Sequence, residues 1–335
     1  MLAPDWAGLR DEELLELRIS RLGLALAGTP LEALIGQLYG ELSAKGLSFH
    51  PPCELGDEWF VPVGLPVIFV PFFLAHERLR LLEKRVMLDV EGAAPEAFMQ
   101  LIRHEAAHAY SYAYRFVRKA RWQRTFGKSS TEETPSFYRP RPYSRSFVVH
   151  LDDWYAQAHP DEDFAETFAV WLTPGLDWRA RYRGWPALRK LEYVDELMRS
   201  LAGRPPLPLP RYRAAEHAGL GLKLKTYYAR KRKENEHSFP DFYDNDLRRL
   251  FDAEGRTRAS AWLRRNRREL EDAVCRWTNE NKYRVNALIK RLIERCGELD
   301  LHVQADTRRL ELQLPVFLTT LVMNHLFTGK FKRTK

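Results

Sequence analysis

The clearest periodic pattern of apolar residues lies between residues 94 and 117, where they recur at the three- and four-residue spacing of one helix face. Ala94-Pro95-Glu96 is typical of a helix start, because proline is favoured in the first turn and an acid suits the positive end of the helix dipole. Gly127 offers a stop. The pattern predicts a long helix whose apolar positions are Phe98, Leu101, Ile102, Ala106, Ala109, Ala113, Phe116 and Val117.

A second helix is predicted from His159-Pro160 to about Pro174-Gly175. Three acids, at positions 161, 162 and 163, occupy its first turn, where they complement the dipole. Its apolar side consists of Phe164, Phe168, Trp171 and Leu172. Glu162 and Glu166 are therefore left one turn apart on the other side.

The chain before the first of these helices reads as a helix followed by strands. Thr29 to Glu32 has the form of a capping box, and Gly46 could end that helix. Val61 to Leu74 and Val86 to Val90 are rich in Val, Ile, Phe and Leu, which favours a small sheet. Four residues that break helices, Pro62, Gly64, Pro66 and Pro71, argue against a membrane span in this apolar region.

Helical spacing returns in the last third of the chain. Residues 259–274 and 282–295 show it most clearly, and 312–327 looks like a final packed helix ended by Gly329. A run of prolines at 204–210 predicts a semi-rigid linker before this part. We therefore expect two domains, residues 1–203 and 211–335, which a chain of 335 residues with 45% apolar content can support.

Charge changes sharply at the linker. Residues 1–204 carry 25 Lys and Arg against 28 acids, whereas 205–335 carry 28 against 17. The second domain could therefore bind nucleic acid or another acidic surface through residues 211–335. The alternative is an arginine-rich exterior that only keeps the protein soluble, and no known nucleic-acid-binding motif accompanies the charge.

The cysteines and the N-terminus bear on the compartment. Cys53, Cys275 and Cys296 are odd in number, far apart and without metal-binding or redox spacing, which is typical of reduced thiols. The first residues include Asp11, Glu12 and Glu13 and lack the pattern of a signal peptide. These features predict a cytoplasmic protein.

Candidate chemistry lies in the two predicted helices. His104 and His108 are four residues apart, so one helix face can aim both imidazoles at one metal ion, and Glu105 beside them can reach a metal-bound water. Two histidines and one carboxylate leave a coordination position open, as in hydrolytic zinc sites. The alternative is a buried helix whose histidines are ordinary hydrogen-bonded core residues. Likewise, the acids at 161–163 could serve only the helix dipole.

Glu162 is the preferred third ligand. A zinc-bound histidine usually donates its second ring nitrogen to a carboxylate, and Glu166, one turn after Glu162, supplies one for His104 or His108. If Glu166 were the ligand, the residue one turn on would be Val170, whose side chain cannot accept a hydrogen bond from a histidine. Less favoured candidates for the third ligand are His150, His159 and Asp163. A third histidine six residues after His108 is excluded, because that position is Tyr114.

These motifs resemble a known family. HEAAH at 104–108, followed by YAQAHPDEDFAETFA at 155–169, is similar to a bacterial zinc-binding metallopeptidase family of the gluzincin type. The resemblance covers about residues 100–175, and the chain after about 205 matches nothing in it. It implies Zn²⁺ held by His104, His108 and Glu162, with Glu105 as general base. The similar spacing in lethal-factor-type toxins implies that Tyr155 faces the zinc and stabilises the oxyanion, although Tyr155 could instead pack beside Trp154.

The sequence thus predicts an α+β, mainly helical protein: a zincin-like metallopeptidase domain with a small sheet, then a basic helical accessory domain. The expected activity is hydrolysis of peptide bonds in a peptide or protein substrate. The resemblance to zincins implies that an edge strand near the site binds the substrate backbone. The alternative is a nucleic-acid-associated or regulatory protein whose metallopeptidase-like domain acts on one partner or has no turnover. The loop at 128–149, rich in Pro, Tyr and Arg, could be a lid or a surface excursion.

Overall fold

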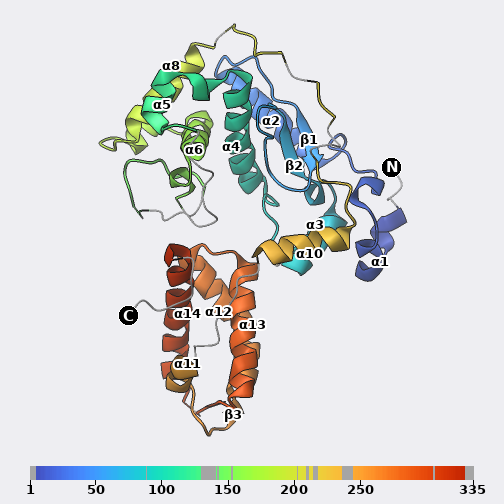
Figure 1. The fold of residues 1–335 in the computed structure, drawn as a ribbon, viewed down its shortest axis with the longest axis vertical. Coiled ribbons are helices and arrows are strands. Elements are labelled where there is room, and N and C mark those ends of the chain that lie inside the picture. Colours follow the sequence, from blue (N-terminus) through green and yellow to red (C-terminus); the bar gives the residue numbers. More distant parts are fainter. Residues whose placement is uncertain are drawn as a thin grey trace. The chain divides into compact units, whose positions relative to one another are not determined.

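The computed structural model describes residues 5–87, 89–129, 141, 143–151, 154–201, 203–208, 211–213, 218–235, 244–304 and 306–328. Its contacts divide the chain into two compact units, residues 1–84 with 90–228 and residues 85–89 with 229–335. Both units are mainly helical (Figure 1). The expected α+β, mainly helical class is confirmed. Within the described residues, no helix combines the length and apolar character needed to cross a membrane.

The first unit is built around two helices that pack against each other, α4 (Pro95–Ala113) and α6 (Pro160–Leu172). α2 (Pro30–Ala44) packs on α4, while α5 (Ala120–Phe126) and α8 (Leu188–Arg199) pack on α6 (Figure 1). α1 (Asp11–Leu15) and α7 (Trp178–Arg181) are short. The boundaries between the two units, after residues 84 and 228, fall within helices α3 (Glu77–Met87) and α10 (Leu224–Asn235).

The sheet of the first unit is small and consists of two parallel strands, β1 (Cys53–Gly56) and β2 (Ile68–Pro71). Every residue of β2 is buried, which explains its continuous apolar character. The rest of the expected strand at 61–74 forms loop and a 3-10 helix, Phe72–Ala75. The expected strand at 86–90 is wrong, because Val86 lies in α3, where charged residues at helical spacing override the local β preference.

The helix at 95 begins as predicted but ends earlier than Gly127. Arg115, two residues after the last helical residue, adopts a left-handed conformation with φ of 51°. Phe116 and Val117 then lie in a 3-10 turn, and Gly127, with φ of 118°, ends α5 instead. The prediction for α6 holds at both ends, since His159 caps its first turn and Gly175, with φ of 70°, lies three residues after its last residue.

The division between the units falls later than residues 204–210. Backbone hydrogen bonds attach the segment after the prolines to the N-terminal region, from Ile19 N–H to Leu222 O (3.0 Å) and from Leu224 N–H to Leu17 O (2.9 Å). Leu207, inside the proline-rich run, donates its N–H to Ala113 O at 3.0 Å. Residues 218–228 therefore belong to the first unit, and the described part of the expected linker is held on its surface.

The second unit is a helical bundle of α11 (Asp244–Leu250), α12 (Ala259–Thr278), α13 (Lys282–Glu298) and α14 (Arg308–Thr328) (Figure 1). Two short strands, β3 (Thr257–Arg258) before α12 and β4 (His302–Val303) between α13 and α14, pair in antiparallel orientation. Leucine, isoleucine and valine side chains from α12, α13 and α14 form one core. The predicted helices at 259–274, 282–295 and 312–327 are confirmed, whereas Gly329 lies outside the described residues.

Candidate metal centre

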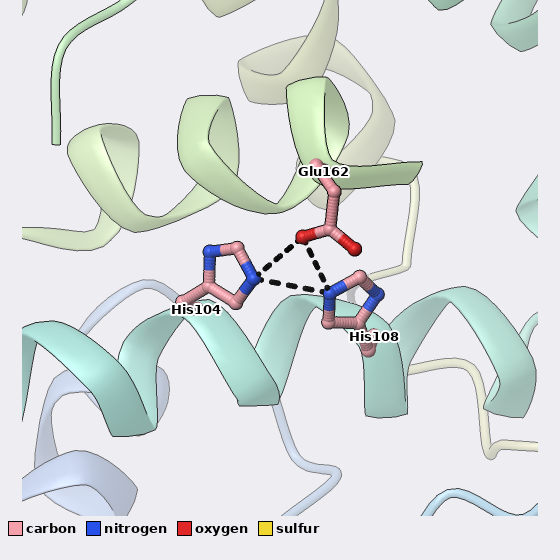
Figure 2. Close-up of side chains that lie close together, drawn as sticks. All are labelled: His104, His108 and Glu162. Atoms are coloured by element: carbon pink, nitrogen blue, oxygen red, sulfur yellow. Dashed lines mark hydrogen bonds and ion pairs between the residues drawn. The ribbon is translucent and has the colours of Figure 1, made fainter. Parts of the chain in front are cut away.

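The site lies where α4 and α6 pack together. His104 and His108 project from successive turns of α4, and Glu162, from the first turn of α6, points between the two imidazole rings (Figure 2). Pro160 and the cap by His159, whose Nδ1 accepts the Asp161 N–H at 3.2 Å, fix where α6 begins. The start of α6 therefore sets the position of Glu162.

The three side chains meet at a single point. Glu162 Oε2 lies 2.9 Å from His104 Nε2 and 3.4 Å from His108 Nε2, and the two ring nitrogens are 3.1 Å apart. Among the described residues, these three side chains form a group whose ligand atoms are close enough together to hold a metal ion. The structure thus brings together the three residues that the sequence suggested as ligands.

The bonding of these atoms suits a cation between them. Glu162 Oε2 is buried and receives no properly directed hydrogen bond from the described residues, although two imidazole nitrogens lie close to it. Burying a carboxylate oxygen without a directed donor is costly, and a metal ion would satisfy it. Two imidazoles and one carboxylate also match the donor set that leaves a zinc ion an open position.

The protonation of the site depends on the metal. Burial lowers the pKa of His104, but the adjacent carboxylates of Glu162 and Glu166 outweigh this and raise the pKa to about 10. Burial raises the pKa of Glu162, but the two histidines outweigh it and hold the carboxyl well below its usual range. Without metal, these carboxylates therefore favour the protonated form of His104. A metal would replace that proton in balancing the negative charge.

Glu166 holds the far side of the first histidine. Its Oε1 lies 2.8 Å from His104 Nδ1, and its Oε2 accepts the Leu151 N–H at 2.8 Å. The side chain is completely buried. A proton on Nδ1 shared with this carboxylate leaves Nε2 directed at Glu162 and His108, as a metal ligand requires. The expected partner of Glu166 is therefore His104 rather than His108.

Glu105 is buried and lies next to the first histidine in sequence. Burial raises the pKa of its carboxyl, while His104 and His108 lower it and Glu162 raises it further. No hydrogen bond or ion pair holds this carboxylate among the described residues. A carboxylate with a raised pKa and no fixed partner is suited to accept a proton from a reacting group.

Tyr155 lies near the cluster but at the surface. Its ring centroid is 5.7 Å from that of His104, and 36% of the residue is exposed. Trp154, with φ of 54°, turns the chain through a left-handed conformation immediately before it. Such a conformation is uncommon for a bulky residue, and it sets the direction in which Tyr155 leaves the backbone.

The less favoured candidates for the third ligand lie outside the cluster. His150 Nε2 is 3.0 Å from Gln100 O, and His159 caps α6. Asp163 Oδ2 pairs with Lys190 Nζ at 2.7 Å, on the buried side of α6. Tyr114, the position excluded as a ligand, donates its hydroxyl to Arg204 O at 3.1 Å.

Sequence reasoning missed two residues around the site. Tyr112 follows His108 by one helical turn. Burial is the main cause that raises the pKa of Tyr112 to about 12, and the negative charges of Asp161, Glu162 and Glu105 raise it further. Its helical spacing from His104 and His108 is the signal that could have identified it. Lys190, which anchors Asp163 beside Glu162, comes from α8, and no local pattern connects it with α6.

Comparisons with known proteins give no independent support for a family. No protein-family model matches the chain, and neither the curated proteins nor the solved structures contain a match. The similarity of the two motifs to zinc-binding metallopeptidases, and the zincin-like fold it implies, therefore remain predictions.

Proposed function

We propose that the protein is a zinc-dependent metallopeptidase in which His104, His108 and Glu162 hold the metal. The convergence of these three side chains, with Glu105 beside them and Glu166 behind His104, is the observation that carries the proposal. A zinc ion at this point would supply a water of lowered pKa and a positive charge that polarises the substrate carbonyl.

The protein's own groups would carry the protons. The Glu105 carboxylate accepts a proton from the attacking water and later donates it to the leaving amide nitrogen, so that water and a peptide bond yield an acid and an amine. The Tyr155 phenol donates a hydrogen bond to the negative charge that develops on the carbonyl oxygen. Glu166 keeps His104 in the tautomer that directs Nε2 to the site.

Replacement of the general base gives the sharpest test. In Glu105→Gln the three proposed ligands are unchanged, so we expect wild-type zinc content together with a loss of hydrolysis of at least about 100-fold, the lower end for general acid–base catalysis. Metal content would be measured by mass spectrometry and hydrolysis with a mixture of fluorogenic unstructured peptides. Chelation should abolish the wild-type activity, and added Zn²⁺ should restore it.

The matched control is Glu96→Gln, because Glu96 lies on the same helix but is exposed. It should retain both zinc and hydrolysis. Equal hydrolysis by wild type and Glu105→Gln would contradict the assignment of the base. If the zinc-loaded wild type cleaved none of the peptides, the second interpretation, a metal-binding domain that acts on one partner or without turnover, would replace a general peptidase.

A further inference from the structure

The outward face of α12 carries a row of arginines. Arg264, Arg265 and Arg268 are exposed near the start of the helix, and Arg276 is exposed near its end. Arg267, in the same run, is only partly exposed and has a buried Nε. With 1.5 Å per residue, the four exposed arginines extend over about 18 Å of helix. We call these four residues the α12 arginine row.

These arginines lack the acidic partners that other arginines of the unit have. Arg295 pairs with Asp244 at 2.7 Å, and Arg284 pairs with Glu280 at 3.3 Å. Among the described residues, no ion pair is formed by any member of the α12 arginine row. Their positive charge is therefore available to a ligand, whereas that of Arg284 and Arg295 is largely balanced.

Acids on the same helix reduce this charge only in part. Asp272 lies between Arg268 and Arg276, but Lys282 of α13 pairs with it at 2.8 Å. Glu269 is exposed at the border of the row. Apart from these charged residues, the described residue exposed along this face of α12 is Ala261, whose side chain is small. A membrane surface, which favours apolar side chains beside basic ones, therefore fits the row poorly.

An exposed tryptophan lies in the last turn of α12, about 100° around the helix from Arg276. Trp277 follows Arg276 directly, and 79% of it is exposed. The exposed indole offers a flat aromatic face on which a second ring can stack. Bases of a single strand can stack on such a ring, whereas the bases of a duplex are already stacked on one another.

We propose that the α12 arginine row and Trp277 form a binding surface for single-stranded nucleic acid. The guanidinium groups bind successive phosphates, and a base stacks on the indole of Trp277. Charge complementarity and the exposed aromatic ring carry this inference, which does not depend on the proposed hydrolysis. An acidic peptide could satisfy the charges, but it would give the indole no comparable flat partner.

Binding would be measured on the full chain by fluorescence anisotropy with labelled 20-nucleotide dT and rU strands and a 20-base-pair DNA duplex, over a range of salt concentrations. The two strands distinguish DNA from RNA. The test variants are the triple variant Arg264→Gln, Arg265→Gln, Arg268→Gln and the single variant Trp277→Ala. The control is Arg248→Gln, Lys290→Gln, Arg309→Gln, which removes the same charge from three exposed residues elsewhere in the unit.

We expect a single strand to bind more tightly than the duplex. Loss of three phosphate contacts should reduce the slope of log K against log salt by about 2, at about 0.7 per contact. Trp277→Ala should weaken binding about 5-fold or more, the lower end for one stacked base. The proposal is overturned if the control weakens binding as much as the test triple, if Trp277→Ala binds like wild type, or if the duplex binds more tightly.

Discussion

Charged groups are held in opposite ways in the candidate metal centre and in the α12 arginine row. In the metal centre, His104, Glu105 and Glu166 are buried, and a hydrogen bond joins the first to the last. In the arginine row, the guanidinium groups are exposed and no described acid pairs with them. The first arrangement fixes side chains at defined positions, whereas the second leaves them free to follow a ligand.

This difference follows from the cost of removing charge from water. A buried charge must be matched by a partner at short distance, so its position is tied to particular neighbours. An exposed charge is hydrated, so its position depends little on particular neighbours. We therefore expect substitutions in the first unit to be felt as losses of stability or turnover, and substitutions on α12 to be felt mainly in binding to a polyanion.

The largest effect on stability is expected at a buried ion pair beside the centre. Arg103, next to His104 on α4, forms two bonds of 2.7 Å with Glu41 of α2, and both side chains are at most 10% exposed. Arg103→Met leaves the charge of Glu41 buried without its cationic partner and should cost about 3–5 kcal/mol of unfolding free energy. Urea unfolding of the full chain, followed by circular dichroism, would measure it.

The double variant Glu41→Leu, Arg103→Met is the control. Removing both charges avoids the unpaired carboxylate, so most of the lost stability should return. A loss below about 1 kcal/mol in the single variant would mean that this pair behaves like a surface pair, and the contrast between the two regions would fail.

The largest effect on turnover, after that of Glu105, is expected at Tyr155. Tyr155→Phe removes one hydrogen-bond donor to the developing oxyanion and should reduce kcat by about 100-fold to 1000-fold with unchanged zinc content. Steady-state kinetics on a cleaved peptide would measure it. Tyr112→Phe is the matched comparison, because that ring lies on α4 one turn after His108. Equal turnover by wild type and Tyr155→Phe would remove the role of Tyr155, and a loss confined to Tyr112→Phe would transfer it.

The parts that the sequence predicted are those that local spacing determines. His104 and His108 share a helix face by their spacing, and the start at Pro160 places Glu162 and Glu166 one turn apart. Contacts between distant segments left no such signal. Lys190 reaches Asp163 from α8, Glu41 reaches Arg103 from α2, and residues 218–228 return to the first unit through backbone hydrogen bonds. The strand expected at 86–90 failed because local β preference yields to tertiary context.

A smaller effect is expected from the residue behind His104. Glu166→Gln keeps the size of the side chain but replaces the charged partner of Nδ1 with a neutral amide. Metal affinity should fall about 10-fold to 100-fold, as for other groups that orient a ligating histidine. Competition with a chelating zinc indicator would measure it, with Glu96→Gln on the exposed face of α4 as control. An affinity equal to that of wild type would indicate that Glu166 serves packing alone.

The smallest effect is expected at an exposed ion pair of the second unit. Lys282 and Asp272 are 2.8 Å apart, as close as the buried pair, but their side chains are 37% and 59% exposed. Because water can replace the partner, Lys282→Met should cost about 0–1 kcal/mol in the same urea experiment. A loss as large as that of Arg103→Met would show that distance rather than burial determines the strength of these pairs. A small loss would show that a short N···O distance alone does not make an ion pair strong, since the closest distances of the two pairs differ by only 0.1 Å.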